Sequence, residues 1–395
     1  MLIHGKPFDE IIEKDLQALI DGNVAEGKQI EYKLTLPNNS DKDKKEFLAD
    51  ISSFANSVGG YIFYGISEDN GLPVELIGLK DVDPDGQVLR LENLLRDAIA
   101  PRIPGLTIRA IPLETSDYII AIMIPRSWAS PHMVIFASVS RFFARNSAGK
   151  YPLDVFELRA AFTASTLETD RIRNFHSDRL RKIISGDMPV KIIDGPKAVL
   201  HLIPVGVLGA GTHHDLKEFQ LSNNREMLAP IYADHGSNFR FNFDGVITFE
   251  RYARSELPVS YLQLFRNGII ESVTTTLFNT EQSPLSIYSQ VFEKELINAL
   301  TRFFKITDKL EIEPPHFIML SLLNVQGYNL PAKSRIVGYG ANIIDRNDLI
   351  VPEVLVEDIK LPPHTILRPL FDAVWNAAGQ PQSPFYDEDG NWNPE

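Results

Sequence analysis

The chain of 395 residues contains no cysteine, which excludes disulfide bonds and thiolate zinc sites. It also lacks any apolar run of about 18 or more residues, and the apolar segment 118–125 is far too short to cross a bilayer. The first ten residues show no basic region followed by an apolar run and a small-residue cleavage site. We therefore expect a cytoplasmic protein with neither a secretory signal nor a membrane partner.

Positive charge is also scarce, because 39 lysines and arginines stand against 52 acidic residues and give a net charge of −13. A nucleic-acid-binding chain is usually basic, so this balance argues against that function. Any such contact would need a local basic surface, or metal ions that offset the repulsion. The hydrophobic content of 44% is typical of a folded protein with a core. The length predicts two or three domains.

Residues 1–165 carry alternating helix and strand patterns. Apolar residues recur with a helical period in 8–20, whereas 30–36 alternate as in a half-buried strand. Because the strand patterns mostly occur in neighbouring pairs, we expect a mixed sheet with helices packed on it. The other elements expected here are a helix that starts near 41 and stops at Gly59-Gly60, strands at 61–66, 74–79, 105–113, 118–125 and 140–145, and helices from 84 and over 153–162.

The sequence after residue 165 predicts a connector, a second domain and a tail. Residues 166–189 read as a basic helical connector, and 190–379 as an α+β domain whose function the sequence leaves open. The pairs Asp244-Gly245 and Asn267-Gly268 predict two antiparallel hairpins, and further helices are expected at 288–305 and 366–378. Residues 380–395 form an acidic tail with too little apolar surface to fold alone. The predicted fold class is thus a mixed one, α/β (α+β), with helices packed on a mixed sheet in the first domain and antiparallel hairpins in the second.

Glu26, Glu31, Lys33 and Asp69 could form a catalytic site. Glu31 and Lys33 lie two residues apart on a predicted strand, so they share a face at roughly 6.5 Å. Asp69, in the turn after strand 61–66, reaches the same end of the sheet if the two strands are neighbours. Three converging carboxylates need a cation, and Mg²⁺ or Mn²⁺ takes such oxygen ligands and assists phosphodiester hydrolysis. Lys33 would then stabilise the transition state.

A plain structural interpretation of the same residues stays open. Glutamate and lysine that alternate on a strand are usually solvated, and they pair for less than about 1 kcal/mol. Asp69-Asn70-Gly71 is also ordinary turn chemistry.

Several segments together resemble the Schlafen-type AlbA_2 domain, and the resemblance covers about residues 15–165. They are EGKQIEYKLTL (26–36), FLADISSFANSVGG (47–60), YIFYGISEDNG (61–71) and RFFARNSAGKYPLDVFELRAAF (141–162). This family is commonly labelled DNA-binding, and its animal members include nucleases that cut transfer RNA and ribosomal RNA. Many prokaryotic relatives are described only as DNA-binding or ATP-binding regulators.

The resemblance also implies a set of site residues. The active site of the animal nucleases is similar to two glutamates spaced as Glu26 and Glu31 are, plus an aspartate where Asp69 stands. It implies a metal-dependent nuclease with these three acids as metal ligands. Those enzymes have two related lobes that form a basic horseshoe, whereas the second half of this chain shows no repeat of the motif.

Four further residues are candidates for nucleic-acid binding: Asn56, Arg141, Arg145 and Lys150. Asn56 is polar in the last turn of a helix, next to glycines that either stop the helix or form a phosphate nest. The three cations surround a pair of phenylalanines, a mixture that can clamp a phosphate backbone and stack bases. Equally, the phenylalanines belong to the core and the cations to a solvated edge.

Three functions remain open from the sequence. The first is a metal-dependent nuclease, a hydrolase acting on RNA, including transfer RNA, or on single-stranded DNA. The second is a non-catalytic DNA-binding or regulatory protein, and the third is a scaffold whose acidic second domain binds other proteins. The sequence does not separate RNA from DNA, and it leaves a homo-oligomer open.

Overall fold

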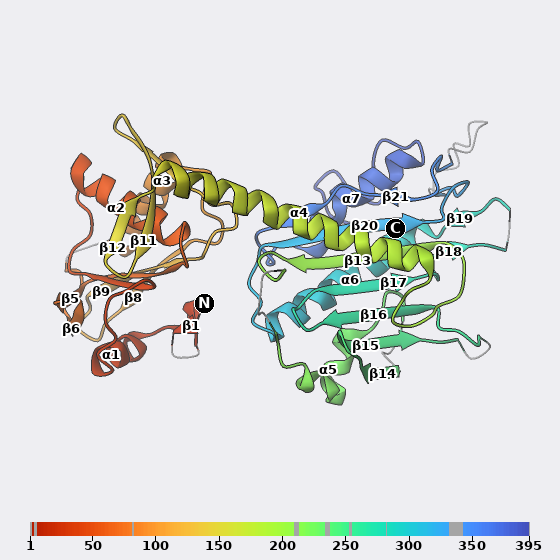
Figure 1. Cartoon of the computed structure of the whole chain (residues 1–395), viewed down its shortest axis with the longest axis horizontal. Coiled ribbons are helices and arrows are strands. Elements are labelled where there is room, and N and C mark those ends of the chain that lie inside the picture. Colours follow the sequence, from red (N-terminus) through yellow and green to blue (C-terminus); the bar gives the residue numbers. More distant parts are fainter. Residues whose placement is uncertain are drawn as a thin grey trace. The chain divides into compact units, whose positions relative to one another are not determined.

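The computed structural model describes residues 2–3, 6–80, 83–208, 213–233, 238–252, 255–281, 283–331 and 343–394. The chain divides into two compact units, unit 1 (Met1–Leu167) and unit 2 (Glu168–Glu395). The division falls inside helix α4 (Val155–Ser185), so the predicted connector is the second half of one continuous helix (Figure 1). Both units contain helices and sheets, which confirms the predicted α+β class.

Unit 1 is built on a four-stranded sheet in the order β3-β4-β9-β8. β3 and β4 run parallel and the other neighbours run antiparallel, which confirms the predicted mixed sheet. Parallel neighbours need a crossover connection, and helix α2 supplies it. The strands are β3 (Ile30–Lys33), β4 (Gly60–Tyr64), β8 (Thr107–Pro112) and β9 (Tyr118–Ile124).

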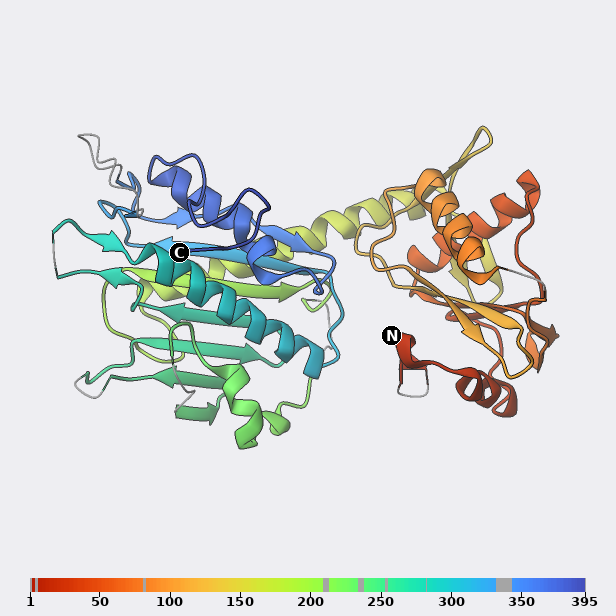
Figure 2. The ribbon, with the colours of Figure 1, turned by 180° about the vertical axis from the view of Figure 1, so that it is seen from behind.

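Helices cover both faces of this sheet. α2 (Asp41–Ala55) and α3 (Pro84–Ala98) pack on one face, while α1 (Glu13–Asp21) packs on the other (Figure 2). The Oγ atom of Ser40 accepts a hydrogen bond from the Asp43 amide at 3.1 Å, so Ser40 caps α2. Gly59 follows the end of α2 with a φ of 72°, a conformation that favours glycine.

Two smaller strand groups complete unit 1. One is a four-stranded sheet in the order β12-β11-β10-β7, whose long strand β11 packs against α2. The other is the hairpin that follows β4. The strands are β7 (Ile99–Ala100), β10 (Met133–Phe136), β11 (Val139–Asn146) and β12 (Gly149–Pro152), then β5 (Ile66–Asp69) and β6 (Leu72–Leu76) in the hairpin, with a short pair β1 (Leu2–Ile3) and β2 (Lys6–Pro7) at the start.

Unit 2 is built on one large sheet in the order β14-β15-β16-β17-β13-β20-β21, with β22 also paired to β20. Both predicted hairpins are confirmed, since β14 pairs antiparallel with β15 and β16 with β17. The strands are β13 (Lys197–Pro204), β14 (Asn238–Phe241), β15 (Gly245–Glu250), β16 (Ser260–Phe265), β17 (Ile270–Thr274), β20 (His316–Leu323), β21 (Leu349–Ile350) and β22 (Val354–Val356), with a separate short pair β18 (Phe278–Asn279) and β19 (Ser286–Ile287).

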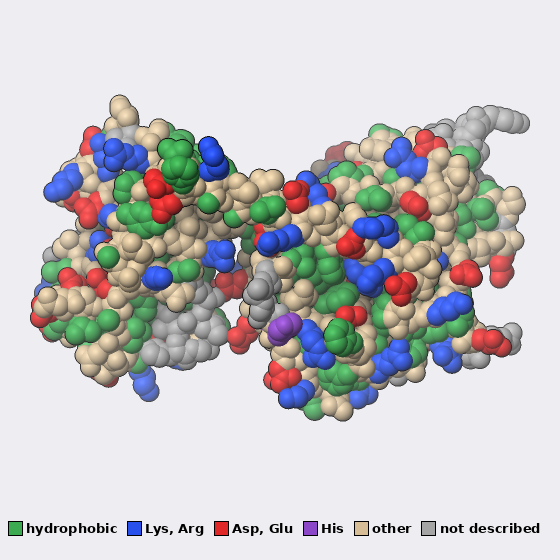
Figure 3. Space-filling model, viewed as in Figure 1, with side chains coloured by type: hydrophobic (Ala, Val, Ile, Leu, Met, Phe, Trp, Pro, Cys, Tyr) green, Lys and Arg blue, Asp and Glu red, His purple; other side chains and the backbone are tan. Residues whose placement is uncertain are grey.

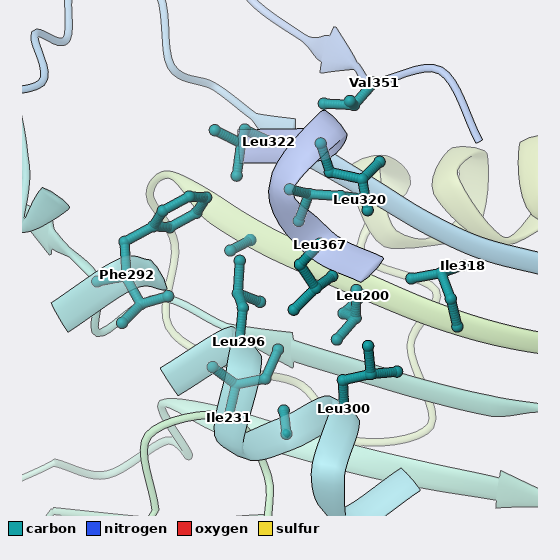
Figure 4. Close-up of a cluster of buried hydrophobic side chains, with 14 of the residues drawn as sticks. Leu200, Ile231, Phe292, Leu296, Leu300, Ile318, Leu320, Leu322, Val351 and Leu367 are labelled. Atoms are coloured by element: carbon teal, nitrogen blue, oxygen red, sulfur yellow. The ribbon is translucent and has the colours of Figure 1, made fainter. Parts of the chain in front are cut away.

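Helices also cover both faces of the unit 2 sheet. α6 (Ser289–Lys309) and α7 (Pro363–Ala377) lie over one face, which Figure 2 shows in front. The larger core fills this side, where Leu296 and Leu300 of α6 meet Leu367 of α7 and the strands beneath (Figure 4). The second half of α4 packs on the opposite face. A short helix, α5 (Ser222–Arg225), lies between β13 and β14 in the chain.

The C-terminal tail, residues 380–395, packs against the rest of unit 2 and does not fold alone. The Phe385 ring is 3% exposed. The Oγ of Ser383 and the indole nitrogen of Trp392 both donate to the buried carboxylate of Glu293 on α6, at 2.7 and 2.8 Å. The tail is ordered because its side chains pack on α6 and α7.

Among the helices in the described ranges, none has both the length and the apolar character required to span a membrane.

Candidate nucleic-acid interface

Strand β3 presents Glu31 and Lys33 toward α2 and β11. The sequence pattern predicted that these two side chains lie on one face, and their direct contact confirms it. The pattern also suggested a solvated face, but Glu31 is only 9% exposed. Glu31 is buried because α2 and the sheet β12-β11-β10-β7 cover the face of β3 that carries Glu31 and Lys33.

Five side chains form an ion cluster at this place, which we call the α2 ion cluster: Glu31, Lys33, Asp50, Arg145 and Lys150. Glu31 is 2.8 Å from the Lys33 ammonium and 2.5 Å from the Arg145 guanidinium. Asp50 is 3.2 Å from the Lys33 ammonium and 2.5 Å from that of Lys150. Lys33 therefore joins the two carboxylates.

The pKa shifts show how strongly these charges interact. Burial alone would raise the pKa of Glu31, but the neighbouring Lys33 and Arg145 outweigh it and the pKa is lowered. Burial would likewise lower the pKa of Lys33, yet Asp50 and Glu31 raise it. The pKa of Asp50 is raised, first by burial and then by Glu31.

Arg145 is fixed inside the domain rather than displayed on its surface. Its side chain is 6% exposed, and its guanidinium lies 4.1 Å from the centre of the Phe54 ring. Its Nε donates to the carbonyl of Gly27 at 3.1 Å. The structure therefore places Arg145 in an ion pair with Glu31, and its contact with nucleic acid stays a prediction.

Glu26 lies at the outer edge of β3. Its carboxylate accepts a hydrogen bond from the Tyr32 amide at 2.8 Å, and its own amide donates to the carbonyl of Gly71 at 2.7 Å. Burial raises the pKa of Glu26, and the nearby negative charges of Glu31 and Glu68 raise it further. Glu26 and Glu31 are thus close enough to interact electrostatically.

Asp69 is the exposed last residue of β5, next to the turn that leads to β6, and its carboxylate accepts from the side-chain amide of Asn70 at 3.0 Å. The sequence predicts Asp69 near the same end of the sheet as Glu31 if their strands are neighbours, and β3 and β4 are indeed paired. However, Glu68 rather than Asp69 is the acid of this hairpin that raises the pKa of Glu26.

The predicted metal ligands are Glu26, Glu31 and Asp69. Each oxygen of Glu31 faces a cation of the protein itself. Across the described residues no group of three histidines or acids is arranged to hold a metal ion. As arranged, these side chains do not fit a divalent cation, and we derive no step through one.

Asn56 ends α2, and its amide group is fully engaged with the small sheet. Its Nδ2 donates to the carbonyls of His132 and Phe143, both at 2.9 Å, and its Oδ1 accepts from the His132 amide at 2.7 Å. Asn56 thus ties α2 to the start of β10 and to β11, and its contact with nucleic acid stays a prediction.

The remaining predicted cations differ in exposure. Lys150 is 26% exposed and belongs to the α2 ion cluster. Arg141 is exposed, and no carboxylate pairs with it in the part of the chain that the structure describes.

Acidic side chains neutralise most of the positive charge of the predicted basic connector. The four arginines of the second half of α4 each pair with an acid: Arg171 with Glu168, Arg173 with Glu353, Arg179 with Glu271, and Arg181 with Asp178. Lysine, arginine and acidic side chains accordingly alternate on the face of unit 2 seen in Figure 3. The connector is therefore less basic in the fold than its composition indicates.

Sequence reasoning missed Asp50, the residue that holds the cluster together. The signal was present, because Asp50 interrupts the apolar face of α2 beside Phe47 and Phe54, and every residue from 47 to 55 is buried. A charged residue in such a position needs partners. Its partners come from distant segments, so the sequence alone did not name them.

Comparison with known proteins gave one family and a weak structural likeness. Residues 26–154 match the family model described as Schlafen, AlbA_2. No curated protein matches the chain. The solved structure of the DIP2311 protein from Corynebacterium diphtheriae is similar with 18% identity over 36% of this chain and a TM-score of 0.24. The match spans 27% of that protein.

The family match contains the α2 ion cluster, Glu26, and the hairpin that carries Asp69. It therefore agrees with the resemblance seen in the motifs. Residues 26–154 of this chain form a Schlafen AlbA_2 domain.

Proposed function

We propose that the AlbA_2 domain binds the phosphate backbone of nucleic acid at the outer side of the α2 ion cluster, with Lys33 and Lys150 as the contacts. The family supports a nucleic-acid-related role. The observation that carries the proposal is that one buried carboxylate, Asp50, holds ammonium groups from two different strands while each lysine stays 26% exposed.

The ordering of the two lysines favours an anionic ligand. Lys33, Arg145 and Lys150 stand against Glu31 and Asp50, and Glu46 also pairs with Lys150 at 3.4 Å, so this neighbourhood is close to neutral within a chain that is acidic overall. Both lysines are already ordered by Asp50, so a phosphate that meets them costs less side-chain entropy than one that meets free lysines. Such contacts are independent of base sequence.

Salt-dependent binding tests this proposal. We would measure fluorescence anisotropy of labelled RNA and DNA oligonucleotides across a range of salt concentrations. Lys150→Gln should weaken binding several-fold, and it should reduce the slope of log affinity against log salt by about 0.9. Lys33→Gln should act in the same direction.

Lys217→Gln is the matched control, because Lys217 is an exposed lysine paired with Asp215 in unit 2. It should leave affinity unchanged. If the wild-type protein shows no salt-sensitive binding to any of these oligonucleotides, the proposal is wrong and a protein-interaction role is favoured.

A second candidate function is hydrolysis of the bound phosphodiester, and one observation favours it. Glu26 is a carboxylate with a raised pKa beside Glu31, and Lys33 lies near enough to affect both. A carboxylate with a raised pKa accepts a proton from water more readily near neutral pH, and an adjacent ammonium stabilises the charge that develops on the phosphoryl oxygens.

Cleavage assays separate this candidate from binding alone. Purified protein would be incubated with transfer RNA or single-stranded DNA, with Mn²⁺, with Mg²⁺ and with chelator. Loss of cleavage in Glu26→Gln and Glu31→Gln, with Glu75→Gln as an exposed control on β6, would support it. Cleavage that needs the added ion would revive the metal prediction, whereas binding without cleavage would leave the non-catalytic function.

A further inference from the structure

The first half of α4, within unit 1, exposes two aromatic side chains. Phe156 is 79% exposed and Phe162 is 51% exposed. No residue from Ala160 to Leu167 is charged. Aromatic side chains this exposed on an ordered helix are unusual for a protein surface that meets only water.

Local contacts hold the segment that carries Phe156 and Phe162 at both of its ends. The Oδ1 of Asp154 accepts from the amides of Phe156 and Glu157, and the Glu157 carboxylate accepts from the Asp154 amide at 3.0 Å. These bonds fix the first turn of α4 and occupy the nearby acids. The Phe162 ring contacts the Phe142 ring of β11, with centres 5.9 Å apart and planes at 78°.

Cations accompany the aromatic side chains. Arg159 is three residues from both Phe156 and Phe162, so it is a helical neighbour of each. Arg141 directly precedes Phe142 on β11. Both arginines are exposed, and neither pairs with an acid within the described ranges, unlike Arg145. Figure 3 shows hydrophobic side chains flanked by lysine or arginine side chains on unit 1 near the start of α4, with acidic ones nearby.

We propose that Phe156 and Phe162 stack against unpaired bases, with Arg159 and Arg141 on the flanking phosphates, so that the ligand of unit 1 is single-stranded RNA or DNA. This inference rests on the proposed nucleic-acid binding and specifies its substrate class. Every base has a π-face, so such stacking tolerates any sequence.

The geometry and charge favour this ligand over the alternatives. The two phenylalanines are six residues apart, about 9 Å along the helix axis and about 120° around it with Arg159 between them, which suits bases that have been unstacked from one another. A duplex keeps its bases stacked inside and cannot offer them to the surface. A wholly apolar partner would leave the two arginines unpaired, whereas phosphates pair with them.

The test compares single-stranded and duplex probes. Anisotropy would be measured with labelled 15-nucleotide single strands of RNA and DNA and with the matching duplexes. Phe156→Ala and Phe162→Ala should each lower single-strand affinity about tenfold and leave duplex affinity unchanged. Phe156→Trp should retain affinity, with its fluorescence quenched on binding, while Phe156→Leu should behave like alanine.

Phe243→Ala is the matched control, because Phe243 is 95% exposed on a turn of unit 2. It should leave both affinities unchanged. If the wild type binds no probe, the proposed function itself fails. If it binds but the alanine variants bind equally well, or Phe156→Leu restores affinity, stacking is refuted while nucleic-acid binding stands. Sedimentation that shows a wild-type dimer dissociated by Phe156→Ala would assign this face to a second copy and overturn the inference.

Discussion

The two units each bury a network of charged side chains, and the networks differ in their access to water. In unit 1 the α2 ion cluster reaches the surface through its lysines. In unit 2 the cluster of Arg179, His201, Tyr261 and Glu271, which we call the β17 ion cluster, joins α4 to the sheet and is sealed. Glu271 and His201 are 0% exposed.

This difference in exposure to water indicates what each cluster can do. Glu271 receives two hydrogen bonds of 2.8 Å from the Arg179 guanidinium, one of 2.9 Å from His201 and one of 2.8 Å from Tyr261. Protein donors occupy both carboxylate oxygens of Glu271, so the β17 ion cluster fastens a helix to a sheet. The α2 ion cluster uses similar chemistry but leaves Lys33 and Lys150 within reach of an anion.

The largest expected effect is in the sealed cluster. Glu271→Gln leaves the Arg179 guanidinium buried without a charged partner, and we expect a loss of about 3–5 kcal/mol in the free energy of unfolding. Urea denaturation followed by circular dichroism measures it. Replacing both residues, as in Arg179→Met with Glu271→Met, should cost less than Glu271→Gln alone. A loss under about 1 kcal/mol for the single variant would show that the cluster is open to water.

A pH effect comes next, also in unit 2. Burial, and then the neighbouring His201, lower the pKa of His176 from 6.5 to about 3. Below pH 6.5 the unfolded chain therefore binds a proton that the folded chain does not, so stability falls as pH falls through 6.5 toward 3. We expect a loss of about 2 kcal/mol between pH 7 and pH 5 from this residue.

Urea midpoints at the two pH values measure this loss. His176→Gln should make the stability less dependent on pH in this range, whatever its effect at pH 7. An unchanged slope in this variant would contradict a neutral, buried His176.

A smaller effect is expected when the same carboxylate-to-amide change is made in the open cluster. Asp50→Asn should cost about 1–2 kcal/mol of unfolding free energy, because the freed ammonium groups of Lys33 and Lys150 can turn toward water. The comparison with Glu271→Gln uses identical denaturation conditions. A loss equal to that of Glu271→Gln would remove the distinction between the two clusters.

The smallest effect is expected at the surface. Glu353 pairs with Arg173 at 2.6 Å, but the two side chains are 28% and 57% exposed. Glu353→Gln should therefore cost less than about 1 kcal/mol, and less again at high salt. A thermal melt in low and high salt checks this, and a cost that salt leaves unchanged would point to a contribution other than the ion pair.

The local patterns of the sequence predicted the elements well. The alternation at Ile30–Lys33 gave β3, and Asp244-Gly245 and Asn267-Gly268 gave the two hairpins. These features depend on backbone preferences and on side-chain period, which act over a few residues. The pairing of Glu31 with Lys33 followed for the same reason.

The rest of the site depends on contacts between distant residues. The sequence placed Arg145 beside phenylalanines as a ligand contact, and nothing local showed that Glu31, more than a hundred residues earlier, would pair with it. Asn56 was similarly assigned to a ligand, although its partners come from β10 and β11. Whether Glu26, Glu31 and Asp69 act in catalysis stays a prediction.

The carboxylate of Glu293 has a consequence for how the chain is made. It accepts hydrogen bonds from Trp375 as well as from Ser383 and Trp392, so residues almost a hundred positions later satisfy a group on α6. During synthesis α6 leaves the ribosome long before those donors exist, and unit 2 must wait for them. A chain that stops after Gly379 would lack the donors Ser383 and Trp392, so the buried carboxylate of Glu293 would keep only the Trp375 donor.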